Sequence, residues 1–165
     1  NAAVAADELS ISFWQRKNST GDSSSFWLHA TSAGSGQRNF QAHAPWSDNT
    51  IYFDTAGCCD ATTRLNANSS TFPNVTDPVL DWWKLWHHFV FTKKGDTKQI
   101  WIDGVLFLEG TGYNPLFTDI TKLYIGAGEN GGSQSRGAID DFAIYSKQLV
   151  EADAIALTAG TLPAR

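Results

Sequence analysis

The sequence predicts an all-β fold in which two antiparallel sheets pack as a sandwich and one short helix follows near the C-terminus. Three observations predict it. Apolar and polar residues alternate with a period of two in several short segments, which is typical of strands with one buried face. Turn-forming residues are frequent, and seven tryptophans occur among 165 residues, a combination that favours β-structure. A single segment has a helical pattern, so the apolar faces of the strands must cover one another.

The N-terminal half contains three predicted strands, at residues 8–17, 39–44 and 50–56. Apolar residues occupy every second position in each of them, and side chains at positions i and i+2 of a strand share a face. The apolar faces predicted in this way are Leu9, Ile11 and Phe13, then Phe40, Ala42 and Ala44, then Ile51 and Phe53.

The C-terminal half is predicted to continue with hairpins. The turn KGDT joins residues 86–94 to residues 98–104. A second hairpin, residues 102–110, turns at Asp103-Gly104, a pair that favours a tight primed turn. Residues 122–128 and 136–147 are predicted as the last two strands, which brings the expected total to between seven and nine.

The helix is predicted within residues 149–160, and Gly160 is its expected stop. Its predicted apolar stripe consists of Leu149, Ala152, Ile155 and Ala156. The longest irregular stretch runs from residue 56 to residue 81, and a loop of that length in a compact domain is usually functional or mobile. No repeat or interdomain linker is visible, so residues 1–165 are predicted to form one domain.

The charge balance excludes some partners. A formal net charge of −5 argues against a nucleic-acid ligand, which requires a basic surface, and against an anionic membrane surface. No apolar run approaches the roughly 18 residues that span a bilayer, and no signal peptide is visible. The sequence contains no methionine, so we interpret it as a processed product or an excised piece of a longer protein.

Three segments together resemble a known family, the laminin G-like, concanavalin A-like lectin/glucanase jelly-roll domains. Residues 8–17 resemble an opening strand, residues 86–107 the central pair of hairpins, and residues 122–157 the closing strand with its short helix. The resemblance implies two curved antiparallel sheets with a concave front face. It also implies a carbohydrate-binding or adhesion module of a larger protein, located outside the cell, at the cell surface or in the periplasm.

The sequence departs from the family pattern at its first strand, and the resemblance also implies a candidate metal site. Family members usually have a further strand before the segment that matches residues 8–17, but only NAAVAAD precedes it here. Either the chain is truncated or a partner strand comes from elsewhere. Asp140 and Asp141 match a position where relatives often hold a structural calcium, whose preferred ligands are oxygens. Alternatively, one of these residues caps a turn or pairs with Arg136.

No catalytic constellation is recognisable in the sequence, so we do not expect an enzyme. Retaining glycoside hydrolysis needs two carboxyls about 5–5.5 Å apart, which in a strand requires an acid-x-acid pattern. Asp140 and Asp141 are adjacent, and therefore point to opposite faces. The string GAGENGG satisfies G-x-G-x-x-G, but a strand follows it instead of the helix that a dinucleotide site needs, so we interpret it as a loop.

The only two cysteines, Cys58 and Cys59, are neighbours in the chain. Adjacent Cα atoms lie about 3.8 Å apart across a trans peptide, whereas ordinary disulfides span about 4.4–6.8 Å. A bond between them therefore forces a rigid corner in the backbone. We predict such a vicinal disulfide beside a ligand site; the alternatives are two free thiols, a bond to another chain, or one thiol buried in the core.

The surroundings of the cysteines predict a ligand site. If the apolar residues of two neighbouring strands face the core, then Gln41, His43, Tyr52 and Asp54 form a polar patch on the opposite face. The loop between the strands and the chain beyond them complete the predicted ligand-binding set: His43, Trp46, Asp48, Asn49, Tyr52, Asp54, Cys58, Cys59 and Arg64. Aromatic faces stack on pyranose rings, and charged side chains hydrogen-bond sugar hydroxyls.

Each of these residues also has a plainer interpretation. Tyr52 and Asp54 fit a solvated sheet face, and His43 fits an ordinary surface residue. The remaining tryptophans are assigned to packing, with one of Trp82 and Trp83 facing outward. They are Trp14, Trp27, Trp82, Trp83, Trp86 and Trp101.

The leading functional hypothesis is a non-catalytic carbohydrate-binding module that recognises a glycan on its concave face and rim with modest affinity. The second is an adhesion or assembly module, because an incomplete first strand leaves a sheet edge that can pair with another protein or a second copy. A polysaccharide-degrading enzyme is the third and weakest hypothesis.

Overall fold

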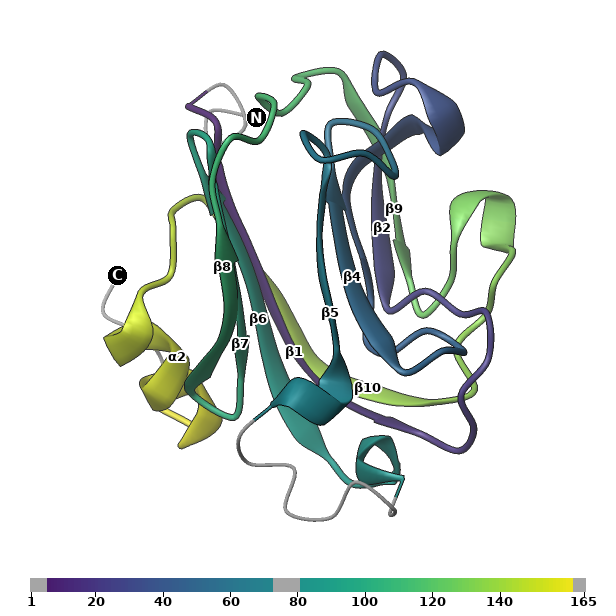
Figure 1. Ribbon diagram of the computed structural model, residues 1–165, viewed down its shortest axis with the longest axis vertical. Helices are drawn as coiled ribbons and strands as arrows, with labels where there is room; N and C mark the ends of the chain where they lie inside the picture. Colours follow the sequence, from purple (N-terminus) through teal and green to yellow (C-terminus); the bar gives the residue numbers. More distant parts are fainter. Residues whose placement is uncertain (1–5, 73–80, 162–165) are drawn as a thin grey trace.

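The computed structural model describes residues 6–72 and 81–161, and it contains two five-stranded antiparallel sheets that face each other (Figure 1). We name them the back sheet, with strand order β10-β1-β6-β7-β8, and the front sheet, with order β5-β4-β3-β2-β9. The back strands are β1 (Glu8–Lys17), β6 (His87–Lys94), β7 (Thr97–Ile102), β8 (Val105–Gly110) and β10 (Gly137–Tyr145). The front strands are β2 (Phe26–Ala30), β3 (Arg38–His43), β4 (Thr50–Thr55), β5 (Arg64–Asn68) and β9 (Ile120–Ile125).

The jelly-roll sandwich predicted from the sequence is confirmed, and its core is built from the predicted apolar faces. All eight of the apolar side chains predicted in the N-terminal half are buried. Phenylalanine rings join the sheets: Phe91 of the back sheet contacts Phe26 and Phe53 of the front sheet at centroid distances of 5.6 and 5.3 Å. Such ring contacts add to the hydrophobic stabilisation of the core.

A buried lysine also links the two sheets. Lys98 extends from β7 and its Nζ donates hydrogen bonds to the carbonyl oxygens of Phe53, at 2.8 Å, and Thr63, at 2.9 Å. Its side chain is fully buried, and Tyr113 covers the amine with its ring. The backbone that carries the outer face of the front sheet is therefore held from the core side as well.

Two strands were missed by the sequence patterns. Strand β2 is buried along its whole length, so it lacks a polar alternation. Strand β5 has the sequence RLNAN, and only Leu65 contributes to the core. The expected irregular stretch at residues 56–81 is therefore wrong in part, because its described residues include β5 and a short 3₁₀ turn, η2 (Ser69–Thr71). Another 3₁₀ turn, η3 (Trp82–Lys84), begins directly after the stretch. Residues 73–80 of that stretch lie outside the described part of the chain.

The C-terminal helix α2 (Glu151–Thr158) lies against the outer face of the back sheet (Figure 1). The predicted stripe is wrong in part: Leu149 is buried as predicted, but it packs with Ala154 against Val90 and Trp101, whereas Ile155 is 52% exposed. Eight residues are too few for the periodicity to show which face is covered. The predicted stop at Gly160 is confirmed by its positive φ of 75°.

The hairpin turn at Asp103-Gly104 brings α2 close to the back sheet. Gly104 has a φ of 78°, and a Cβ at this position would lie 3.3 Å from the Cα of Ile155. Glycine is therefore required both by the left-handed backbone and by the approach of the helix.

The tryptophans pack broadly as predicted. Trp27, Trp83 and Trp101 are buried. Trp82 is half-buried against the core and donates a hydrogen bond from its indole nitrogen to Ser69, at 2.9 Å. The tryptophan of this segment that faces solvent is Trp86, which is 42% exposed, and not Trp82 or Trp83 as expected.

One side of the sandwich is open. Within the described residues, β9 pairs only with β2 and β10 only with β1. Leu123 and Ile125 lie opposite Leu28 and Phe26, on the core-facing side of the front sheet, but remain 37% and 49% exposed. Ile144 of β10 is 46% exposed on the other side of the same opening. Among the described residues, no helix is long and apolar enough to span a membrane.

Candidate functional site on the front sheet

The candidate site is the outer face of the front sheet, which points away from the core. Antiparallel register places Trp27, Gln41, Asp54 and Arg64 in one row across β2, β3, β4 and β5. His43 and Tyr52 form the next row. Because these residues alternate with buried apolar ones, the sequence pattern itself directs them to this face.

Arg64 and Asp54 form an ion pair at the β5 edge of this face. The guanidinium donates two hydrogen bonds of 2.7 Å to the two carboxylate oxygens, the geometry of a strong bidentate pair. Asp54 is fully buried beneath Arg64, so the expectation that its side chain is displayed on the surface is wrong. The hydrogen bonds to Asp54 raise the pKa of Arg64 above its usual value. Arg64 also covers Tyr52, with its central carbon 4.5 Å from the ring centroid.

His43 is buried and supports the face from below. Its Nδ1 lies 3.1 Å from the carbonyl oxygen of Ser23, and its Nε2 lies 2.7 Å from the side-chain amide of Gln41. A carbonyl oxygen can only accept, so Nδ1 carries the proton and Nε2 accepts from Gln41. Burial, assisted by nearby positive charges, lowers the pKa of His43 to about 3. The ring stays neutral and packs against Trp46 at a centroid distance of 4.2 Å.

The loop between β3 and β4 presents Trp46, Asp48 and Asn49 at one end of this face. It is closed by a hydrogen bond of 2.9 Å from the Trp46 amide to the carbonyl of Thr50. Asp48 accepts the Thr50 amide at 2.9 Å and the hydroxyl of Tyr52 at 2.8 Å. Trp46 is half-buried, while Asp48 and Asn49 are exposed, so this end combines an aromatic surface with free polar groups.

The cysteine corner lies at the opposite end of the face. The structure joins Cys58 and Cys59 in a disulfide between neighbours, with their Cα atoms 3.7 Å apart. Backbone hydrogen bonds from Ala56 and Gly57 tie the corner to β3, at 3.1 and 2.7 Å. Cys59 is exposed, and the two sulfurs and the Asp54 carboxylate lie within 4.8 Å of one another. We expect no metal there, because the sulfurs are bonded to each other and Asp54 is held by Arg64.

Arg38 belongs to the site but was missed by the sequence reasoning. Its guanidinium covers the Trp27 ring at 4.7 Å, and its Nη1 lies 3.5 Å from the sulfur of Cys59. Strict alternation places Arg38 on the same face as Phe40, in the core. A register shift between β2 and β3 pairs His29 with Arg38 instead, so the arginine emerges on the outer face. Such bulges leave no clear signal in the sequence.

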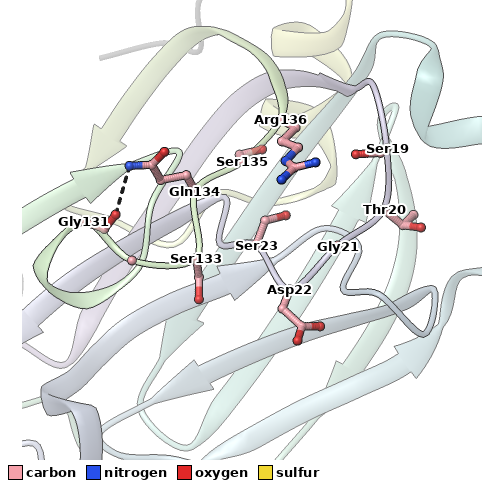
Figure 2. A pocket seen from close by; sticks show the side chains of 11 residues that line it. Ser19, Thr20, Gly21, Asp22, Ser23, Gly131, Ser133, Gln134, Ser135 and Arg136 are labelled. Carbon is pink, nitrogen blue, oxygen red and sulfur yellow. Dashed lines mark hydrogen bonds between the residues drawn. The ribbon is translucent and has the colours of Figure 1, made fainter.

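A polar pocket adjoins the Trp46 end of the face (Figure 2). Its volume is about 620 Å³, and its walls are residues 19–23 and residues 131–136. Figure 2 shows Arg136 and Ser19 extending from the two walls toward the space between them. A hydrogen bond of 2.5 Å from Ser47 to Asp22 connects this pocket to the Trp46 loop. The wall segments contain only turn-forming and polar residues, so the sequence offered no motif for them.

The predicted loop at GAGENGG is confirmed, because it holds the short turn η4 (Glu129–Gly131) and leads into strand β10. Asp140 and Asp141 lie on β10, at the other sheet from the candidate site. Both are exposed, and Asp140 accepts a hydrogen bond of 2.9 Å from the amide of Asp141. Calcium binding at these two residues stays a prediction.

Comparisons with known proteins support the fold. The profile of the concanavalin A-like lectin/glucanases superfamily, a laminin G family, matches residues 1–155. A comparison with curated protein sequences gave no match. Among solved structures, a carbohydrate-binding domain of a Ruminococcus gnavus sialidase, bound to α2,3-sialyllactose, has a TM-score of 0.69 at 12% identity. The match covers 95% of this chain and 85% of that one.

Binding domains of botulinum neurotoxins are similar to the same degree. One of them, from neurotoxin DC in complex with SialylT, has a TM-score of 0.68 at 16% identity, covering 96% of this chain. Another, bound to rat synaptotagmin II, has a TM-score of 0.65 at 16% identity, covering 95% of this chain. The chain spans only 37% and 36% of the length of these two structures. At such identities the likeness shows a shared fold.

Proposed function

Because this chain belongs to the concanavalin A-like lectin/glucanase superfamily, we propose that it is a non-catalytic carbohydrate-binding domain whose ligand lies on the outer face of the front sheet. The observation that carries the proposal is the surface formed by Trp46, Tyr52 and Arg64 beside an open polar pocket. Aromatic rings offer stacking surfaces for the C–H face of a pyranose, while guanidinium and carboxylate groups hydrogen-bond its hydroxyls.

The site is held rigid by residues that a ligand would not need to touch. His43 packs beneath Trp46, and Asp54 fixes the guanidinium of Arg64. A surface that is already ordered loses little conformational entropy when it binds, which favours recognition by a shallow site. In this proposal His43 and Asp54 act from below, while Trp46, Asp48, Asn49, Tyr52, Arg64 and the Cys58–Cys59 corner contact the glycan.

The carboxylates of the site are occupied in ways that favour binding over hydrolysis. Asp54 is paired with Arg64, and Asp48 accepts hydrogen bonds from Tyr52 and Thr50. A general acid must instead hold a proton near neutral pH. Turnover of a polysaccharide that is lost in Asp54→Asn, with the fold intact, would contradict the non-catalytic proposal.

Two structural relatives support a glycan as the ligand class. The Ruminococcus gnavus domain is bound to α2,3-sialyllactose, and a botulinum neurotoxin binding domain is in complex with SialylT. Glycans of this kind are displayed outside cells, so an extracellular, cell-surface or periplasmic location is part of the proposal. A structural calcium at Asp140 and Asp141 is a separate part, and a chelator tests it.

A glycan array tests the proposal directly. We expect the wild-type chain to retain a defined set of glycans, and Trp46→Ala to lose them by about tenfold or more, because stacking on one ring is removed. Trp86→Ala is the matched control, since Trp86 is more exposed than Trp46 but lies outside the site. Equal losses in both variants, or no glycan bound by the wild-type chain, would contradict it. A repeat with chelator separates calcium dependence from ligand recognition.

A second candidate function is favoured by the open side of the sandwich, where β9 has no second neighbour among the described strands and Leu123, Ile125 and Ile144 remain exposed. The edge expected from an incomplete first strand is not present at β1, because β1 pairs with both β10 and β6. A free edge with apolar side chains is suited to an extended strand of a partner protein. Size-exclusion mass distinguishes the two: a monomer that binds glycans favours the first candidate, and an obligate oligomer that binds no sugar favours the second.

A further inference from the structure

Arg38 is a positive charge with unused hydrogen-bonding capacity. A guanidinium has five N–H donors. The one side-chain hydrogen bond of Arg38 in the described residues is from Nη1 to the sulfur of Cys59, at 3.5 Å, and sulfur is a weak acceptor. Its Nε is buried and has no acceptor among the described residues. A buried donor without an acceptor costs free energy. Nε is closed to solvent, but Arg38 is half-buried overall and its Nη2 forms no hydrogen bond within the described residues, so the guanidinium keeps donors for a ligand.

The orientation of Arg38 is set by its neighbours. Its guanidinium lies over Trp27, whose indole nitrogen donates a hydrogen bond of 3.1 Å to the carbonyl of Gly36. Any Cβ at Gly36 would lie 3.1 Å from the Trp27 ring and 3.5 Å from Nε of Arg38. Glycine at this position therefore leaves room for the stacked pair, and stacking on Trp27 holds the guanidinium on the outer face.

Arg38 forms no ion pair with the carboxylates around it in the described residues. Asp54 is the nearest buried carboxylate, but both of its oxygens are bonded to Arg64. Glu129 attracts Arg38 at longer range, without an ion pair in the described part of the chain. Burial lowers the pKa of Arg38 below its usual value, because desolvation opposes the charged form. Two guanidinium groups thus share the Asp54 carboxylate. The carboxylate of Asp60, which directly follows the cysteine corner, accepts hydrogen bonds from Thr62 and Thr63 and forms no ion pair with either arginine in the described residues.

The two arginines flank the disulfide symmetrically. Arg38 contacts the sulfur of Cys59 at 3.5 Å, and Arg64 contacts the sulfur of Cys58 at 3.7 Å. The corner holds the two guanidinium groups apart. Because sulfur is a weak hydrogen-bond acceptor, it leaves most of their N–H donors available to a ligand. A small oxyanion seated at this corner would find donors from both sides.

From this geometry we infer that the Arg38 end of the site is an anion subsite, and that the preferred ligand is an acidic sugar whose carboxylate or sulfate group pairs with Arg38. This inference rests on the proposed carbohydrate-binding function and specifies its ligand class. The neutral part of the glycan then extends from the cysteine corner over Arg64 and Tyr52 toward Trp46. A charge-assisted bidentate pair gives both affinity and orientation.

Matched ligands test the subsite. Binding of 3′-sialyllactose, 3′-sulfated lactose and unmodified lactose is measured by isothermal titration calorimetry on the same chain. We expect at least one acidic ligand to bind about tenfold or more tightly than lactose, in line with a hydrogen bond to a charged group. The comparison of carboxylate with sulfate shows which anion fits. Raising the salt concentration should reduce this preference, because the pair is partly exposed.

Substitutions locate the anion. In Arg38→Gln we expect the acidic ligand to bind no more tightly than lactose, whereas Arg38→Lys keeps part of the preference. Arg136→Gln tests the other guanidinium beside the site, because Arg136 is exposed in the neighbouring pocket. Arg16→Gln is the matched control, because Arg16 also lies over a tryptophan, Trp86, but on the back sheet. Thermal unfolding of each variant confirms that it folds, and if Arg38→Gln does not, the intermediate preference expected of Arg38→Lys tests the inference on its own.

Failure of the anion subsite can be distinguished from failure of the proposed carbohydrate-binding function. A wild-type chain that binds lactose and both acidic ligands equally contradicts the anion subsite but leaves the carbohydrate-binding function standing. The same holds if Arg136→Gln removes the preference while Arg38→Gln or Arg38→Lys keeps it in full. A chain that binds no glycan of any kind on an array contradicts both.

Discussion

Arg64 covers Asp54 so completely that the carboxylate is inaccessible, and the same guanidinium forms part of the exposed surface. One ion pair therefore serves both stability and recognition. The buried partner needs the arginine to offset its desolvation, while the ligand surface needs the carboxylate to hold the arginine in place.

Removal of Arg64 should destabilise the fold. We expect Arg64→Ala to lower the free energy of unfolding by about 3 kcal/mol, because it leaves a buried carboxylate without its partner. Lys84→Ala is the control, since it breaks an exposed ion pair with Asp81 and should cost less than about 1 kcal/mol. Urea denaturation measures both. Similar small changes in the two variants would show that the Arg64 pair is not a buried one.

Stability should decline in acid because of buried histidines. Burial holds the pKa of His43 at about 3, and burial likewise lowers the pKa of His88 to about 4, both below the usual value of 6.5. In the unfolded chain both residues bind a proton below 6.5, so the stabilisation present above that pH is lost as the pH falls toward the folded-state values. His43 alone should account for about 2 kcal/mol by pH 5.

Thermal unfolding between pH 7.5 and pH 4 measures this dependence. In His43→Gln the pH dependence should be shallower than in the wild-type chain, and His88→Gln should show the same direction of change. An unchanged slope in His43→Gln would show that this ring is protonated in the folded chain. His43 should not add a titration to glycan binding between pH 5 and 8, because burial keeps its ring neutral there.

The cysteine corner predicts a redox-sensitive site. The native chain should take up no alkylating reagent, and after reduction it should take up two equivalents, as intact mass reports. Reduction should weaken glycan binding severalfold, since the sulfurs space Arg38 and Arg64. The Cys58→Ser/Cys59→Ser variant should bind like the reduced chain. Two alkylated thiols in the native chain would remove the rigid corner from the site.

Alanine substitutions at Gly104 and Gly95 distinguish the cost of backbone strain from the cost of a steric clash with the helix. Gly104→Ala should destabilise the chain more than Gly95→Ala, although both positions have a positive φ. At Gly95 a Cβ meets no atom within 4 Å, so only backbone strain of about 1 kcal/mol is expected. At Gly104 the Cβ also contacts α2. Equal losses of unfolding free energy would show that the helix moves freely away.

The strands could be predicted from the sequence wherever one face of a strand is polar. Phe40 and Ala42 alternate with Asn39 and Gln41, so strand β3 and its facing were both correct. Strand β2 was not recognised, because Trp27 is buried under Arg38 on its outer side and the strand has no polar face. Periodicity reports burial on one side only, and it fails where loops and side chains cover the other.

The sequence placed the candidate site on the correct face of the strands, but it did not predict how deeply each residue is buried. Asp54 and Tyr52 alternate with core residues in the same way, yet one is buried and the other half-buried. Asp54 is buried because Arg64, ten residues farther along the chain, bonds both of its carboxylate oxygens, whereas the Tyr52 hydroxyl extends to the exposed Asp48. Arg38 was missed because a single-residue register shift turns it outward. Contacts across strands and bulges depend on tertiary structure, which local patterns do not encode.

Lys98 gives the sandwich a mechanical consequence. From the core side, its amine donates a hydrogen bond to Phe53 of β4, the strand that bears Asp54. It donates another to Thr63, in the loop that follows the cysteine corner. Loosening between the two layers on warming will therefore distort the recognition surface early. Glycan affinity should therefore fall at temperatures where the far-ultraviolet circular dichroism is still native. Ligand binding would then report loosening of the core before any loss of secondary structure is visible.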